Sequence, residues 1–142
     1  MERYLLDTNI FTFLATGESD RISKDVAAIL ENYDNEFLIG MESVRELIVA
    51  YRRGKAISKF FKSPLDVIES IERDYRIRIV QTDMEVMRTM AKLKINTAEE
   101  HNDPSDHVII AQAITMRLPL ISSDHKFLFY RKQGLDLIYN ES

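Results

Sequence analysis

The sequence predicts an α/β fold, a three-layer sandwich in which helices flank a mostly parallel central sheet. Two observations lead to this fold class. Short apolar segments typical of buried strands alternate with longer segments in which apolar residues recur at helical spacing. Such alternation favours a parallel sheet covered by helices. The chain length fits one domain, and we expect residues 1–142 to form it.

The N-terminal half contains two predicted strands, residues 3–7 and 36–40. Its predicted helices cover residues 19–34, 41–53, 55–62 and 64–75. The first of these helices would begin at Ser19 or Asp20, which are good N-cap residues. The second places an apolar stripe on one face and ends before Gly54. The stripe consists of Val44, Leu47, Ile48 and Tyr51.

The C-terminal half contains three predicted strands, residues 77–82, 118–122 and 135–139. One predicted helix spans residues 83–94, and a loop follows it. Another helix begins within the segment HNDPSDHVIIAQA, residues 101–113, and a short one covers residues 125–130. The order of strands and helices is that of an α/β sandwich.

Composition excludes several classes of protein. The chain contains no cysteine, so it has neither disulfides nor thiolate metal ligands, which is consistent with a reducing cytoplasm. No apolar stretch approaches the roughly 20 residues of a membrane helix, and we expect no membrane partner. An acid at position 7 interrupts the N-terminal apolar stretch, which argues against a signal peptide. The net charge of −4 argues against a wholly basic nucleic-acid binder but allows a local basic patch.

Acidic residues recur where strands end or helices begin. Ligands of open parallel sheets bind at the carboxyl ends of the strands, so these side chains are expected to lie near one another. The acids at such positions are Asp7, Glu42, Glu46, Asp103, Asp106 and Asp124.

Each of these acids also has a purely structural explanation. Asp103 is a good N-cap, and Pro104 suits the first helical position. Asp106 alone could be a solvated first-turn acid, because the helix dipole favours an anion there. Asp7 could belong to a turn, and Asp124 could cap the helix of residues 125–130. Several acids meeting at one sheet edge are harder to explain in this way.

A cluster of carboxylates would repel itself or hold protons unless something neutralised it. A divalent cation would do so. Oxygen ligands without cysteine or clustered histidine suit Mg²⁺ or Mn²⁺ rather than Zn²⁺. Because Mg²⁺ is usually shared with substrate phosphates, the cluster points to phosphodiester chemistry.

Four blocks of the sequence resemble the PIN-domain nucleases, and most closely the single-domain VapC-type toxins of bacterial toxin–antitoxin pairs. The blocks are LLDTNIF, SVREL, DPSDHVIIAQA and LISSDHKF, and the resemblance runs from Arg3 to about Tyr139. It implies a PIN-like fold and a cytoplasmic endoribonuclease that cleaves single-stranded or structured RNA with metal-activated water. It also implies a homodimer held by a cognate antitoxin.

The resemblance assigns roles to particular residues. The four acids that hold Mg²⁺ or Mn²⁺ and serve catalysis correspond to Asp7, Glu46, Asp106 and Asp124. Accessory positions of the pocket correspond to Asp103, Asn9 and Ser122. Glu42 is a rival to Glu46, although the SVREL spacing favours Glu46. Many relatives have arginine where this chain has His107, so the resemblance implies no phosphate contact at this position.

A basic segment follows the second block. Between residues 45 and 62 six cations stand against one acid. An RNA-backbone contact is one interpretation, because phosphate binding relies on Lys and Arg, and an ordinary solvated helix face is the other. The candidate RNA-binding residues are Arg52, Arg53, Lys55 and Lys59.

Two other functions remain open. A catalytically silent PIN module that binds RNA or protein is the main alternative, although the full set of acids argues against it. A haloacid-dehalogenase-like phosphatase would require an acid two residues after Asp7, where Asn9 stands instead.

Overall fold

The computed structural model describes residues 1–141 and contains one central five-stranded sheet. All pairs of neighbouring strands are parallel, in the order β3-β2-β1-β4-β5. The strands are β1 (Arg3–Leu6), β2 (Glu36–Gly40), β3 (Ile77–Val80), β4 (Leu120–Ser122) and β5 (Leu137–Tyr139). The predicted α/β class is confirmed, and the sheet is parallel throughout.

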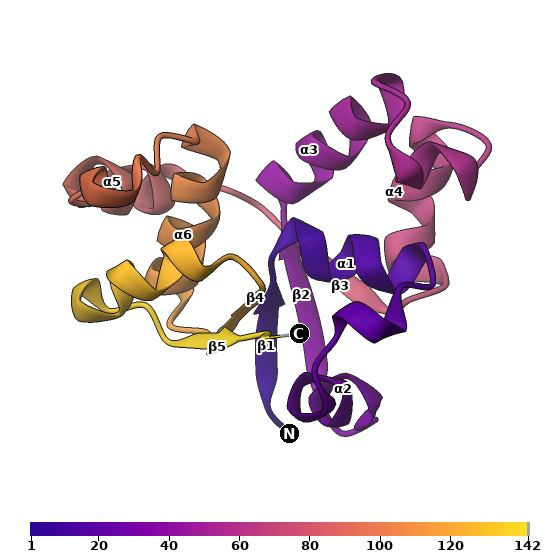
Figure 1. The fold of residues 1–142 in the computed structure, drawn as a ribbon, viewed down its shortest axis with the longest axis horizontal. Helices are drawn as coiled ribbons and strands as arrows, with labels where there is room; N and C mark the ends of the chain where they lie inside the picture. Colours follow the sequence, from indigo (N-terminus) through magenta and orange to yellow (C-terminus); the bar gives the residue numbers. More distant parts are fainter. Residues whose placement is uncertain (142) are drawn as a thin grey trace.

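Helices cover both faces of the sheet. The α-helices are α1 (Thr8–Ala15), α2 (Lys24–Glu31), α3 (Met41–Arg52), α4 (Pro64–Arg73), α5 (Met84–Lys92) and α6 (Pro104–Met116). The 3-10 segments are η1 (Ser19–Arg21), η2 (Ala56–Lys59), η3 (Thr97–Glu99) and η4 (His125–Gln133). Figure 1 shows α1 to α4 on one side of the sheet, and α5 and α6 on the other. This arrangement gives the predicted three layers.

The two helical layers bury two separate cores against the sheet. Leu5, Leu38 and Leu120 lie in register on neighbouring strands and pack toward the α6 side. Leu6 and Ile121, each one position later in its strand, pack toward α1 and α3. Successive side chains of a strand point to opposite faces, and both faces here are covered. The strands therefore read as continuous apolar runs.

The structure corrects the prediction near the N-terminus. Helix α1 was not predicted, because Thr8, Asn9 and the Phe residues that follow have modest helix propensity. Asp7 caps this helix, and burial of Ile10 and Phe11 against the core stabilises it.

The single helix predicted for residues 19–34 was wrong as well. Residues 19–21 form η1, and α2 begins after Ser23, whose hydroxyl accepts a hydrogen bond from Val26 N–H at 3.3 Å. The buried Asn140 side chain accepts the Ser23 N–H at 2.7 Å and fixes this start. The helix expected for residues 55–62 is shorter too, since only Ala56–Lys59 form a 3-10 turn.

The topology brings the carboxyl ends of the strands to one edge. From β1 the chain moves through β2 to β3 on one side, and β4 then pairs with β1 on its other side. The strand order reverses between β1 and β4, and ligands of open α/β sheets bind at such a point. Asp7 is the first residue after β1, and Asp124 is the second residue after β4. No helix among residues 1–141 combines the length and apolar character needed to cross a lipid bilayer.

Candidate metal centre and active site

Four carboxylates from four different elements line one cavity at this edge of the sheet. Asp7 follows β1, and Asp124 follows β4. Glu46 lies on α3, the helix that continues from β2, and Asp106 lies in the first turn of α6. The cavity measures about 270 Å³ and is lined by Asp7, Thr8, Asn9, Thr12, Phe13, Glu46, Asp106 and Asp124. Elements far apart in the sequence thus bring together the four acids expected to bind metal.

Asp7 is the most deeply buried of the four acids, with 4% of its surface exposed. The Ser122 hydroxyl donates to its Oδ2 atom at 2.7 Å, and Thr8 N–H donates to Oδ1 at 2.8 Å. Burial nevertheless raises the Asp7 pKa to about 7, and the charge of Asp106 contributes. Ser122 also accepts the Asp124 N–H at 3.1 Å. It therefore fixes the two strand-end acids relative to each other.

Glu46 faces the same cavity from α3. The Thr8 hydroxyl donates to Glu46 Oε1 at 2.6 Å, and burial raises the pKa of this carboxyl. The rival acid Glu42 instead forms an ion pair with Arg45 at 2.6 Å. Its Oε1 also accepts a 3.3 Å hydrogen bond from Ser105. Glu42 already has a cationic partner, so this geometry favours Glu46 as the acid of the cavity.

The two acids of the DPSD segment have different surroundings. Asp103 is exposed and caps α6, since its Oδ1 atom accepts Ser105 N–H at 3.0 Å. Pro104 occupies the first turn, as predicted. Asp106 is partly buried, and burial followed by the charges of Asp103 and Asp124 raises its pKa to about 7. The capping role expected for Asp103 is thus confirmed, whereas Asp106 faces the acid-lined cavity.

Asp124 combines two roles as well. Its Oδ1 atom accepts Lys126 N–H at 3.0 Å and so caps η4, as the structural explanation of this residue anticipated. It also lines the acid cavity. A cap contact uses one carboxylate oxygen and leaves the other available to the cavity.

A buried histidine next to Asp106 was not predicted as part of the site. His101 is 2% exposed, and its Nε2 atom lies 2.9 Å from Asp106 Oδ2. Ligand atoms of His101, Asp106 and Asp124 all lie within 4.8 Å of one another, as do those of Glu46, Asp103 and Asp106. His101 lies five residues before Asp106 and precedes α6, so no helical periodicity relates the two residues. The one sequence signal was its place at the start of the HNDPSD block.

His107 does not take the place of a surface arginine. The side chain is buried, and its Nε2 atom lies 2.8 Å from the carbonyl oxygen of His101. The ring can donate an Nε2–H to this oxygen. His107 therefore stabilises the loop that carries His101 and is not available to a phosphate.

The donor set of the cavity fits a divalent cation. Two carboxyls whose pKa values are raised to about 7 lie close to further acids, and a cation would neutralise this repulsion. Asn9 lines the same cavity, and its buried Oδ1 atom has no hydrogen-bond partner among residues 1–141. Carboxylate and amide oxygens are the ligands that Mg²⁺ and Mn²⁺ prefer. Asp7, Glu46, Asp106 and Asp124 could hold the ion, and Asn9 could add a neutral oxygen.

A second cavity with basic walls adjoins the acidic one. It measures about 320 Å³ and is lined by Arg45, Glu46, Val49, Ala50, Arg53, Lys55, Asp103 and Ser105. The two cavities share Glu46. Two of the four cations expected to bind RNA, Arg53 and Lys55, thus lie beside the acids. Arg52 and Lys59 are exposed on the same segment but outside the described lining of this cavity.

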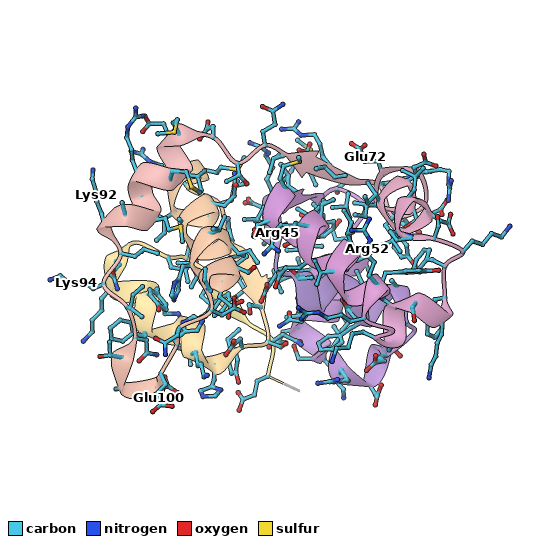
Figure 2. All side chains as sticks on the ribbon, turned by 90° about the horizontal axis from the view of Figure 1, so that it is seen from above. Arg45, Arg52, Glu72, Lys92, Lys94 and Glu100 are labelled. Carbon is cyan, nitrogen blue, oxygen red and sulfur yellow. The ribbon has the colours of Figure 1, made fainter. Side chains whose placement is uncertain are left out.

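Arg45 was absent from the predicted RNA-binding set. Its Nη2 atom donates to Ser105 Oγ at 2.6 Å and so links α3 to α6 beside the acids. Figure 2 shows Arg45 near the middle of the molecule, and Arg52 farther along α3. Sequence alone could not select Arg45, because the selection depends on which face of α3 lies toward α6.

Comparisons with known proteins agree with this fold. The chain is similar to a chain of VapBC2 from Rickettsia felis bound to a DNA fragment from their promoter (TM-score 0.71, 20% identity, 98% of this chain and 99% of that chain). It is also similar to DNA-bound VapBC from Salmonella typhimurium (TM-score 0.68, 18% identity, 98% of both chains). VapBC-5 from Mycobacterium tuberculosis, a member of the VapBC family of toxin–antitoxin systems, matches with a TM-score of 0.62 and 20% identity over 100% of both chains.

The comparison with curated proteins finds no match. A family model gives the assignment instead: the model described as PIN domain matches residues 4–134, nearly the whole chain. This protein belongs to the PIN domain family.

Proposed function

We propose that the protein is a Mg²⁺- or Mn²⁺-dependent endoribonuclease and the toxin of a type II toxin–antitoxin pair. The observation that carries the proposal is the convergence of Asp7, Glu46, Asp106 and Asp124 on one cavity at the switch point of a parallel sheet. Membership of the PIN domain family and the likeness to VapBC structures support it.

Each part of the cavity has a role in this reaction. A bound divalent cation lowers the pKa of water and stabilises charge on phosphate oxygens. Asp7, Glu46, Asp106 and Asp124 would hold the ion. Ser122 and Thr8 would orient two of these carboxylates through their hydroxyl groups. Asp103 would keep the first turn of α6 in place and act on the substrate only through water.

The basic cavity next to the acids gives the RNA strand a path. Lys and Arg neutralise backbone phosphates regardless of sequence. Arg53 and Lys55 line a hollow that shares Glu46 with the acidic cavity, so a strand bound there would pass close to the acids. Arg52 and Lys59 would extend this contact along the same exposed segment. Single-stranded RNA, or unpaired parts of a structured RNA, would be the substrate.

The direct test is RNA cleavage by the purified protein. We expect cleavage with Mg²⁺ or Mn²⁺ and none in EDTA, with 5′-phosphate and 3′-hydroxyl ends, because water rather than the ribose 2′-hydroxyl is the nucleophile. Mass spectrometry of the products identifies the ends. Cleavage that persists in chelator, or 2′,3′-cyclic phosphate ends, would contradict the metal mechanism. RNA binding without any cleavage would favour a catalytically silent module.

A partner protein is part of the proposal. The similar structures are VapBC proteins, and one is named as a member of a toxin–antitoxin family. We propose a homodimer held in the cytoplasm, where RNA is accessible, by a cognate antitoxin that presents a basic side chain to the acid cavity.

The partner can be tested by coexpression with the product of the adjacent gene, followed by light scattering and the RNA assay. We expect a stable complex without ribonuclease activity, because a basic side chain would neutralise the acids in place of the metal. The protein alone should have twice the mass of one chain. A monomer that neither binds this product nor loses activity in its presence would instead be a stand-alone nuclease.

A further inference from the structure

A buried row of hydrogen bonds lies behind Asp106. Asn96 N–H donates to the Tyr130 hydroxyl at 3.1 Å, and that hydroxyl lies 2.9 Å from His101 Nδ1. On the other side of the ring, His101 Nε2 lies 2.9 Å from Asp106 Oδ2. Tyr130 is 0% exposed and His101 is 2% exposed, so bulk water does not compete with these contacts.

The partners fix the direction of each hydrogen bond. The Tyr130 hydroxyl accepts from Asn96, and its own proton has one acceptor among residues 1–141, His101 Nδ1. A neutral imidazole that accepts at Nδ1 carries its proton on Nε2. The Nε2–H group then points at Asp106, whose ionised carboxylate can only accept. Every group in the row is satisfied by this one arrangement.

The opposite tautomer would leave a buried proton unpartnered. If Nε2 were free to bind a metal ion, Nδ1 would carry the proton and donate it to Tyr130. The Tyr130 hydroxyl would then face two donors, Asn96 N–H and Nδ1–H, and its own proton would have no acceptor among the described residues. An unsatisfied buried polar group costs about 1–3 kcal/mol. The contacts therefore make His101 a donor to Asp106 rather than a metal ligand.

The imidazole ring is also held by packing. The ring centroids of Phe127 and Tyr130 lie 5.5 Å from that of His101, and the His107 ring lies at 5.0 Å. His107 further anchors the His101 carbonyl oxygen. His101 binds Asp106 Oδ2 and so fixes the orientation of the carboxylate. Asp106 Oδ1 makes no hydrogen bond to a described residue and is available as a ligand.

We propose that His101 is a positioning residue, which holds Asp106 ready for a divalent cation through its Nε2–H proton, and that the Tyr130 hydroxyl supports this state by donating to Nδ1. This inference rests on the proposed metal-dependent function. Hydrogen-bond partners of metal ligands typically contribute about 10- to 100-fold to metal affinity. We therefore expect Tyr130 to influence a site that it does not touch.

The tautomer can be read directly by ¹⁵N NMR of the histidine rings in the full-length protein at mildly alkaline pH. We expect the proton of His101 on Nε2, both without metal and with Mg²⁺, which does not broaden the spectrum. Tyr130→Phe removes the hydroxyl that donates to Nδ1, while Asp106 still accepts the Nε2–H, so the proton should stay on Nε2 and the Nδ1 signal should move to the position of a nitrogen without a hydrogen bond. A proton found on Nδ1 in the wild type would overturn the proposal.

Mn²⁺ binding, measured by calorimetry without RNA, tests the consequence for the metal. The amide nitrogen of glutamine can take the place of Nε2, whereas the asparagine side chain is too short for its amide nitrogen to reach Asp106. We expect His101→Gln to bind Mn²⁺ within about threefold of wild type, and His101→Asn to bind about 10- to 100-fold more weakly. Tyr130→Phe should be weakened in the same direction, by a smaller factor.

Tyr51→Phe is the matched control, because it also removes one hydroxyl contact, to the Phe61 carbonyl oxygen at 2.9 Å. It should bind Mn²⁺ like wild type. Equal Mn²⁺ affinity of wild type, Tyr130→Phe and His101→Asn would overturn the positioning role alone. Failure of the wild type itself to bind Mn²⁺ would overturn this proposal together with the proposed function. The wild-type titration therefore separates the two failures.

Discussion

Asp106→Asn is expected to abolish RNA cleavage while the protein remains folded. The substitution removes one charged oxygen ligand from the acid cavity but keeps the size of the side chain. The asparagine carbonyl oxygen can still accept the His101 Nε2–H that Asp106 Oδ2 faces at 2.9 Å. Loss of a hydrogen-bond partner of a metal ligand typically lowers metal affinity or activity about 10- to 100-fold. Loss of a direct ligand should therefore lower activity at least about 100-fold. Initial cleavage rates at saturating Mg²⁺ measure the loss.

Asp103 provides the matched control within the same segment. Asparagine is as good an N-cap as aspartate, so Asp103→Asn should barely change stability and should lower activity only in part. Asp103→Ala should cost about 1 kcal/mol of unfolding free energy, the usual loss of a cap. Thermal melts beside the cleavage assay separate these effects. Normal cleavage by Asp106→Asn with an inactive Asp103→Asn would mean that the two roles are reversed.

The fold could be predicted because it depends on strong local patterns. Strands buried on both faces read as apolar runs, and helices such as α3 show a regular apolar stripe that ends before Gly54. Helix α1 lacked such a pattern. Its sequence, TNIFTFLA, is helical because Phe11 and Phe13 are buried by distant segments, and this tertiary effect overrides local propensity.

The acids of the site could be predicted for a related reason. In a parallel sheet the ends of strands share an edge, so position along the sequence already indicates proximity for Asp7 and Asp124. The groups that tune these acids could not be found in this way. The contacts of Thr8 with Glu46 and of Tyr130 with His101 join residues 38 and 29 positions apart. Such contacts depend on how helices pack on the sheet, which no local pattern encodes.

The same cluster that suits a metal should make the metal-free protein sensitive to pH. Burial and neighbouring charges raise the pKa values of Asp7 and Asp106 from 3.8 to about 7. Between these values the folded chain keeps protons that the unfolded chain has released. The free energy of unfolding must then fall as pH rises from about 4 to about 7. Above about pH 7 these two carboxyls cause no further change, because both states have released the protons. For one such carboxyl, the free energy of unfolding falls by at most about 4 kcal/mol over this pH range.

Melts of wild type and Asp106→Asn in EDTA, at about pH 5 and about pH 8, test this linkage. Asparagine does not ionise and relieves the repulsion on Asp7, so the variant should gain about 2–4 kcal/mol relative to wild type at the higher pH and roughly a third of that at the lower. Mg²⁺ should stabilise wild type mainly at the higher pH, where the carboxylates are free to bind it, and should stabilise the variant less. A difference between the two proteins that is equal at both pH values would show that Asp106 is not held in a repelling cluster, and the physical case for a cation at this edge of the sheet would lose its main support.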